Sequence, residues 1–297
     1  MNSQPSGAAE NTTARKRVVA FDLNAVEDLP TLPTVVQRAL SLTADPRSSA
    51  KDLAEVIALD QALTAKVLRI VNSAFYGLSR KISTVKDGVV VIGFNAVRSI
   101  ATAASIVNMF GGKGGHAGAF NYGDFWIHSI GVGICSMNLA QAIRYPRADH
   151  VFTAGILHDL GKIVLDHHAR DYFSAVLERA KRDSSTFWMA EEALGGPTHA
   201  FIGHKLAVRW NLPDELGEGM GGHHDPLATE SKFSRIVFLA DKLCKAHKVG
   251  HAGDFCSSVV CPEDWAVLGL SEAAISSVLS QMELIHSRAK LFIEVAK

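Results

Sequence analysis

The sequence lacks the features that define several classes of protein. Its 30 basic residues balance its 30 acidic residues, so the whole chain has no net attraction for nucleic acid or anionic membranes. It has only four cysteines and no C-x-x-C pair, which excludes a disulfide-rich fold and a compact cysteine zinc site. No apolar run approaches the roughly 18 residues of a membrane helix, and the N-terminus has no hydrophobic signal core. These absences predict a cytoplasmic protein without a membrane segment.

Helical patterns dominate what is present. The chain has 297 residues, 47% of them hydrophobic, which is enough for one large domain or two small ones. Apolar residues recur at helical spacing almost throughout, and no long segment alternates with a period of two. We therefore predict an all-α fold with two helical subdomains. The predicted parts are a disordered tail (1–17), an N-terminal helical subdomain (18–110), a glycine-rich linker (111–118), a second helical subdomain (119–250) and a C-terminal helical extension (251–297).

Local signals predict several helices in detail. Ser49 with Asp52, and Thr84 with Asp87, have the spacing of residues that cap a helix start. The apolar tetrapeptide 89–92 is flanked by helical pattern and is predicted to be buried helix. A single helix is predicted over 152–165, and one helix or a pair over 271–295. Cys135 and Cys244 are expected on core faces.

A histidine and an aspartate lie next to each other in one of these apolar helices, at His158-Asp159. An unpaired charge is costly in a buried helix, so Asp159 needs a partner. A core hydrogen bond between the two side chains would be the simpler explanation for an isolated pair. A divalent metal ion is the alternative, because imidazole nitrogen and carboxylate oxygen both bind such ions.

The pair is not isolated, because other polar side chains lie in or beside apolar segments. Five imidazoles and two carboxylates would fill one six-coordinate site or two adjacent sites. Iron, manganese, nickel and zinc suit such ligands about equally. The surface histidines His116, His247 and His251 are excluded, and His167 and His168 are predicted to be exposed. The predicted metal ligands are His128, His158, Asp159, His199, His223, His224 and Asp241.

Two residues of this region are candidates for a catalytic role. Lys162 follows His158 by four residues and would be placed to hold a phosphate above the metal ions. The alternative for Lys162 is a surface lysine whose ammonium group reaches solvent. Asp159 carries the carboxylate that can bridge two cations.

The order of these residues resembles a known superfamily. His128, then His158-Asp159, then Asp241 resemble the H…HD…D signature of the HD metal-dependent phosphohydrolases. His199 and the doublet His223-His224 resemble the ligands that the HD-GYP branch adds for a second metal. The chain as a whole is most similar to the HDOD family, through the phrases at 29–33, 72–77, 82–85, 92–93 and 203–224.

The resemblance implies an all-helical bacterial signalling or regulatory protein, with the second subdomain an HD-type helical bundle. Members of the HDOD family commonly lack demonstrated enzymatic activity and often have degenerate metal positions. This chain departs from that pattern, because its ligand set is complete. It departs from the HD-GYP branch as well, because Asp225-Pro226-Leu227 replaces the glutamate and the Gly-Tyr-Pro loop. The departure disfavours hydrolysis of cyclic di-GMP and leaves metal binding intact.

Three functional hypotheses follow. The first is a regulatory module with a metal centre that acts through a signalling protein partner. The apolar helical faces of residues 29–110 would bind this partner or serve for self-association. The second is a metal-dependent phosphohydrolase acting on a nucleotide or another phosphoester. The third is DNA binding, because 51–72 resembles a helix-turn-helix and the segment 61–81 has four basic residues and no acidic residue. The balanced charge and the lack of glycine in the turn disfavour nucleic acid as a partner.

Overall fold

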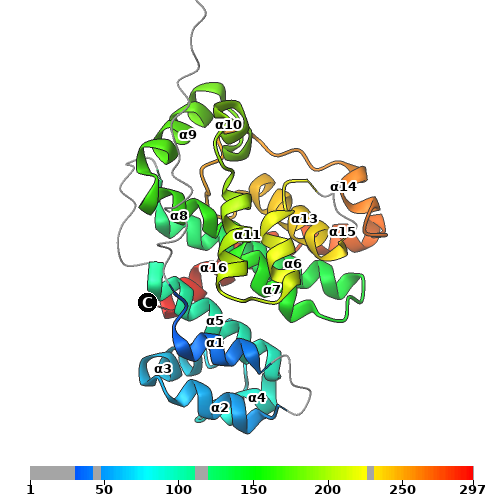
Figure 1. Ribbon diagram of the computed structural model, residues 1–297. Coiled ribbons are helices and arrows are strands. Elements are labelled where there is room, and N and C mark those ends of the chain that lie inside the picture. The colour runs from blue at the N-terminus through cyan, green and yellow to red at the C-terminus, as the bar shows by residue number, and fades with distance from the viewer. Residues whose placement is uncertain (1–30, 43–47, 111–119, 226–230, 297) are drawn as a thin grey trace, which may run out of the picture.

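The computed structural model describes residues 31–42, 48–110, 120–225 and 231–296 of the 297-residue chain. Within these ranges the chain forms helices α1 to α16 and no strand, so the predicted all-α fold is confirmed (Figure 1). None of the helices in the described part of the chain is both long and apolar enough to span a bilayer.

The first helices form a small lobe at one end of the molecule, which we call the N-terminal lobe (Figure 1). Its helices pack against one another in pairs, α1 with α2, α2 with α4 and α3 with α4. The lobe consists of α1 (Thr34–Ser41), α2 (Ala50–Ala58), α3 (Gln61–Val71) and α4 (Val85–Ile92), and α5 (Phe94–Phe110) covers it.

The remaining helices form a larger body around the pair α6 and α7, with α13 and α16 packed on α6 (Figure 1). The helix α6 is buried along most of its length. The helices of the body are α6 (Tyr122–Ala142), α7 (Ala148–Leu157), α8 (Leu160–His168), α9 (Arg170–Asp183), α10 (Phe187–Leu194), α11 (His199–Arg209), α12 (Asp214–Gly221), α13 (Lys232–Ala246), α14 (Pro262–Ala266), α15 (Glu272–Leu279) and α16 (Met282–Ala296).

The predicted helix starts at Ser49 and Thr84 are confirmed. Ser49 accepts a hydrogen bond from the Asp52 amide, and the Asp52 carboxylate accepts one from the Ser49 amide. Thr84 accepts a hydrogen bond from the amide of Asp87. These bonds satisfy amide groups that have no partner within the helix.

The single helix predicted over 152–165 is wrong, because the chain breaks between α7 and α8. The break falls at His158 and Asp159, which are the last cap of α7 and the first cap of α8. The apolar pattern runs through the break unchanged, so periodicity could not reveal it. The break turns both side chains of the pair toward the inside of the body.

The segment 89–92 is helical as predicted, but its predicted burial is wrong for two residues. Val90 is 74% exposed and Val91 is 41% exposed, whereas Val89 is buried. A helix of eight residues at the edge of a lobe can bury only one face, and these two valines lie on the other. The segment 271–295, predicted to form one helix or a pair, forms the two helices α15 and α16.

The helices α5 and α16 connect the N-terminal lobe to the body. Residues Val97 to Ala104 of α5 are all buried, because α5 packs against α3 on one side and α7 on the other. The helix α16 contacts α3 and α6. Arg288 of α16 donates a hydrogen bond to the carbonyl of Phe75 at 2.6 Å, and the ring of Phe292 lies 5.6 Å from that of Phe75.

Two predicted segments lie outside the described residues, the tail at 1–17 and the linker at 111–118. The predicted boundaries of the subdomains therefore stay predictions. Cys135 and Cys244 are buried as expected.

Candidate metal centre

The seven predicted ligands come together in the body from five parts of the chain. His128 comes from α6, His158 and Asp159 from the break between α7 and α8, and His199 from the first residue of α11. Six of the seven are at most 4% exposed, and His224 is partly buried. His223 and His224 follow α12, and Asp241 lies on α13.

The seven side chains form two groups. In each group the possible ligand atoms lie within 4.8 Å of one another. The first group is His128, His158 and Asp241, and the second is Asp159, His199, His223 and His224.

Asp159 contacts both groups. Its Oδ1 lies 3.0 Å from Nε2 of His199, and its Oδ2 lies 3.4 Å from Nε2 of His158 and 3.9 Å from Nε2 of His128. One carboxylate thus faces both clusters of imidazoles, the geometry of a bridging ligand.

Close packing at Gly161 helps to fix this arrangement. A Cβ atom at Gly161 would collide with the carbonyl oxygen of His199, so only glycine lets α8 approach the start of α11 this closely. The approach brings Asp159, at the cap of α8, next to the imidazole of His199.

Three imidazoles of the centre are oriented by the backbone. In each ring Nδ1 faces a carbonyl oxygen. Because a carbonyl oxygen can only accept a hydrogen bond, Nδ1 carries the proton. The Nε2 atom of the neutral ring then presents a lone pair to the centre of the cluster. The contacts are His128 to Val249 at 3.2 Å, His158 to Gly155 at 2.6 Å and His223 to Met220 at 2.9 Å.

His199 is oriented in the same way by a carboxylate. Its Nδ1 donates to Oε2 of Glu191 at 2.7 Å, and its backbone amide donates to Oε1 of Glu191 at 2.7 Å. Glu191 is fully buried on α10. Carboxylates that hold the outer nitrogen of a ligating histidine are common in metal sites.

These orientations bring lone pairs of nitrogen and oxygen face to face. Nε2 of His128 lies 3.0 Å from Oδ1 of Asp241, and Nε2 of His158 and Oδ1 of Asp159 are buried without a hydrogen-bond partner. Such contacts repel unless a proton or a cation lies between the atoms. Imidazole and carboxylate donors in this arrangement fit divalent metal ions.

The pKa values describe how protons would satisfy the same contacts. Burial alone lowers the pKa of His158, but Asp159 and Asp241 outweigh it and raise this pKa to about 9. Burial lowers the pKa of His223 to about 4, so this ring is neutral. Burial also raises the pKa of Asp159, but Lys162 and His158 outweigh it and hold this pKa well below its ordinary value. A cation would take the place of the second proton on His158.

Lys162 is fully buried, so the alternative of a surface lysine is wrong. Its ammonium group donates to Oδ2 of Asp159 at 2.8 Å and to the carbonyl of Ala252 at 2.9 Å. It also lies 5.1 Å from the centre of the Phe187 ring. The phosphate-binding role predicted for Lys162 stays a prediction.

Three further residues of the centre were missed by sequence reasoning, Glu191, Lys245 and Asp254. Lys245 pairs with Oδ2 of Asp241 at 2.8 Å and with Oδ2 of Asp254 at 3.1 Å. The spacing of four residues between Asp241 and Lys245 was a usable signal. Asp254 lies in a loop and Glu191 on a separate helix, and neither has a local signal.

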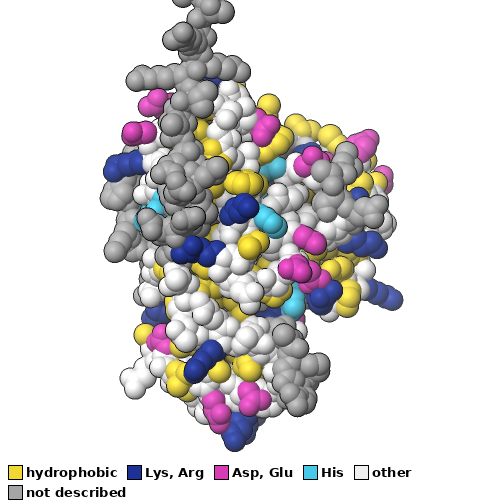
Figure 2. Space-filling view, in the orientation of Figure 1, with side chains coloured by type: hydrophobic (Ala, Val, Ile, Leu, Met, Phe, Trp, Pro, Cys, Tyr) yellow, Lys and Arg dark blue, Asp and Glu magenta, His cyan; other side chains and the backbone are white. Residues whose placement is uncertain are grey.

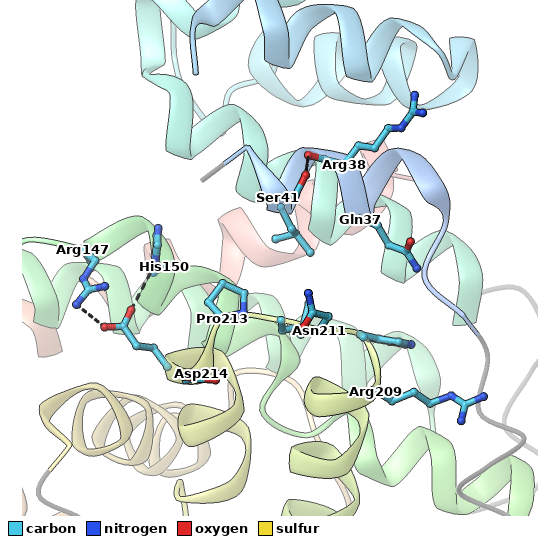
Figure 3. A pocket seen from close by; sticks show the side chains of 13 residues that line it. Gln37, Arg38, Ser41, Arg147, His150, Arg209, Asn211, Pro213 and Asp214 are labelled. Carbon is cyan, nitrogen blue, oxygen red and sulfur yellow. Dashed lines mark hydrogen bonds and ion pairs between the residues drawn. The ribbon is translucent and has the colours of Figure 1, made fainter. Parts of the chain in front are cut away.

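A cavity of about 960 Å³ lies elsewhere, between the N-terminal lobe and the body. Figure 3 shows Gln37 of α1 on one side of this cleft and Asn211 on the other. On its wall Arg147 pairs with Glu215 at 2.5 Å. None of the seven predicted ligands lines it.

The fold and the buried centre define a class, an all-helical protein with a His/Asp cluster suited to divalent ions. The sequence model of the HDOD domain family matches residues 29–226 of this chain. The chain belongs to the HDOD domain family. The Asp225-Pro226-Leu227 departure from the HD-GYP branch lies mostly outside the described residues.

Individual proteins are similar to this chain. The structure of an HDOD domain protein of unknown function from Geobacter sulfurreducens is 27% identical, with a TM-score of 0.80 over 89% of this chain and 93% of that one. A presumed phosphohydrolase from Shewanella amazonensis is 22% identical, with a TM-score of 0.74 over 93% of this chain and 97% of that one. An uncharacterized protein of Treponema pallidum is 22% identical over 218 residues, 73% of this chain. The chain spans 41% of that relative's length.

Proposed function

We propose that this HDOD protein is a bacterial signalling or regulatory module that binds one or two divalent metal ions and acts by binding a protein partner. The orientation of the imidazoles is the main observation that supports metal binding. Their Nδ1 atoms are held by acceptors, so their Nε2 atoms face the carboxylates of Asp159 and Asp241. This arrangement is expected of metal ligands and is costly without a cation.

In this proposal His128, His158 and Asp241 would hold one ion, and His199, His223 and His224 would hold the other. Asp159, whose two oxygens face different groups, would be a ligand of both ions. Glu191 orients His199, and Lys245 orients Asp241. When bound, a divalent ion supplies Lewis-acid polarisation of a ligand oxygen, and in a regulatory module it also links five segments of the chain.

Exposed apolar side chains of the N-terminal lobe support the partner surface. Leu59, Val90 and Val91 are 63%, 74% and 41% exposed. They lie at the end of α2 and on α4, which pack together at the end of the molecule away from the body (Figure 1). Exposed apolar side chains that gather on one surface mark sites of protein association.

The alternative is a metal-dependent phosphohydrolase acting on a nucleotide or other phosphoester. The bridging position of Asp159 favours it, because two adjacent cations can hold both sides of a phosphoryl group. The name of the Shewanella amazonensis protein points the same way. Lys162 disfavours it, because its ammonium group is already held by Asp159 and Ala252.

Nucleic acid is the least supported partner. Lys66, one of the basic residues in the region resembling helix-turn-helix, is buried and donates to Asn108 at 2.9 Å. Figure 2 shows basic and acidic side chains interspersed on the face in view rather than gathered in a basic patch. Phosphate recognition needs clustered basic residues.

Two measurements test the proposal. Elemental analysis of protein purified without added metal should find at least one divalent ion per chain. Immobilised full-length protein should retain a protein partner from a lysate of the source bacterium, and Val90→Glu should abolish the retention. Val208→Glu, at a valine 64% exposed on α11 of the body, is the matched control. A metal-free protein, or one that stays monomeric and retains no partner, contradicts the proposal.

A further inference from the structure

The side chains in and around the metal centre, most of them buried, carry more negative than positive charge. Among the described residues, four carboxylates lie within the cluster or directly against it, and two ammonium groups pair with them. The imidazoles that serve as ligands are neutral. With every group ionised, the formal excess is two negative charges. The carboxylates are Asp159, Asp241, Asp254 and Glu191, and the ammonium groups are Lys162 and Lys245.

A buried cluster is stable only when its charge is nearly balanced, because uncompensated charge is expensive away from water. One divalent cation cancels the excess of two negative charges. A second divalent cation would leave an excess of two positive charges. Charge balance therefore allows one cation by itself and opposes the second.

The geometry nevertheless provides for two cations. The two groups of ligands are separate, and Asp159 directs one oxygen to each. A second cation can bind at low cost if an anion with two negative charges arrives with it. Hydrogen phosphate and phosphomonoesters carry about this charge above their second pKa, which is near 6 for phosphoesters.

A small pocket next to the centre has the size and charge for such an anion. Its volume is about 260 Å³, just under the ~300 Å³ at which cavities begin to fit drug-sized ligands. Lys245, which pairs with Asp241, forms part of its wall. The polar lining is otherwise His128, Lys248, His251, Asp254, Ser257 and Ser258.

We propose that the centre binds one divalent cation alone and takes up the second together with a phosphate dianion held in this pocket. The inference rests on the metal centre of the proposed function. It adds that metal loading and phosphate binding are coupled, so the occupancy of the second position reports the presence of a phosphate ligand. Coupling of this kind is reciprocal, and each ligand raises the affinity for the other by the same factor.

The test uses full-length protein freed of metal with a chelator and titrated with Mn²⁺ at a pH where phosphate is a dianion. Metal per chain is measured by equilibrium dialysis, and electron paramagnetic resonance detects a spin-coupled pair of ions. The arms contain inorganic phosphate, glycerol phosphate, or sodium chloride at matched ionic strength. We expect one ion per chain in chloride and two coupled ions in phosphate, with about tenfold or greater tightening of the second.

The arms with inorganic phosphate and glycerol phosphate distinguish the free ion from an ester. Tightening by inorganic phosphate alone identifies the free ion as the ligand, and equal tightening by both shows that the pocket accepts esters. Two equally tight ions in chloride, or one ion even in saturating phosphate, overturn the inference. Absence of bound Mn²⁺ in every arm instead overturns the metal centre itself.

Two variants change the charge in opposite directions. Lys245→Gln raises the negative excess to three, so the second ion should bind more tightly in chloride and depend less on phosphate. Asp254→Asn lowers the excess to one and should have the opposite effect. A purely structural role for these residues predicts weaker binding in both variants, which would contradict the charge argument.

Two further lysine variants test the pocket and provide a control. Lys248→Gln, on the exposed side of the pocket, should weaken the effect of phosphate, and it keeps the inference testable if the Lys245 variant does not fold. Lys181→Gln, at an exposed lysine on α9, is the matched surface control and should behave as the unaltered protein. An unchanged phosphate effect in Lys248→Gln counts against the pocket.

Discussion

Nε2 of His199 lies 3.0 Å from Oδ1 of Asp159, and both atoms present lone pairs. The proton of the His199 ring is on Nδ1, where Glu191 accepts it at 2.7 Å. The contact between nitrogen and oxygen therefore makes chemical sense when a cation, or a second proton on the ring, lies between them. Burial alone lowers the pKa of His199, but Glu191 outweighs it and raises this pKa.

Replacing the bridging carboxylate should remove most of the metal. Asp159→Asn turns a charged ligand that faces both groups into a neutral amide with one acceptor oxygen. We expect most of the metal to be lost from the protein as isolated, measured per chain by elemental analysis. Asp166→Asn is the matched control, because Asp166 is buried on α8 but bonds Tyr122 instead. Full occupancy in Asp159→Asn would show that its assignment is wrong.

Replacing the carboxylate of Glu191, which orients His199, should weaken metal binding at only one of the two positions. In Glu191→Gln the NH₂ group of the new side chain faces either the backbone amide or Nδ1 of His199. If it faces Nδ1, that nitrogen must accept a hydrogen bond, and the ring proton moves to Nε2. Loss of such an outer partner typically lowers metal affinity about 10- to 100-fold. We expect this loss for one of two ions in a Mn²⁺ titration with phosphate present. Glu192→Gln, at the exposed neighbouring glutamate, should change nothing.

Local hydrogen bonds explain which parts of the fold the sequence could predict. The starts of α2 and α4 depend on Ser49 and Thr84, whose partners lie three residues away. The ligands could be found because a histidine or aspartate in an apolar helix needs a partner. The break at His158 and Asp159 could not, because apolar residues continue on both sides of it.

The partners of the ligands show the limit of sequence reasoning. Glu191 contacts the centre through hydrogen bonds to His199 that join two separate helices, α10 and α11. A buried glutamate on α10 has the same local pattern as an exposed one, as its neighbour Glu192 shows. The exposure of Val90 is likewise set by which face of α4 meets the lobe.

The C-terminal helix should contribute strongly to stability. Phe292 of α16 is fully buried, with its ring 5.6 Å from that of Phe75 in the N-terminal lobe. Phe292→Ala should lower the free energy of unfolding by about 3–5 kcal/mol, because it leaves a cavity where the lobe and the body meet. Leu284→Ala, at a leucine 55% exposed on the same helix, should cost far less. Denaturant unfolding measures both, and equal losses would contradict the predicted packing.

His150 should make the folded protein sensitive to acid. Burial, together with Arg98 and Arg147, lowers its pKa from 6.5 to about 4. A group whose pKa is lower in the folded state adds stability above pH 6.5 and loses it as the pH falls toward 4. We expect the melting temperature of His150→Gln to fall less between these pH values than that of the unaltered protein. His247→Gln, at an exposed histidine, is the control, and parallel curves for His150→Gln and the unaltered protein would refute the assignment.

Hydrolysis of cyclic di-GMP should be negligible, which separates the regulatory module from the phosphohydrolase. A phosphodiester must be held in line for attack, and errors of about 1 Å can cost on the order of a hundredfold in rate. Lys162, which was predicted to hold the phosphate, is buried and donates hydrogen bonds to Asp159 and Ala252 instead. The pocket beside the centre, at about 260 Å³, is small for a cyclic dinucleotide. We expect no linear product by chromatography from protein loaded with iron or manganese, and at most weak activity on simple phosphoesters. Turnover that disappears in both His158→Ala and Lys162→Ala would overturn this prediction and establish the phosphohydrolase.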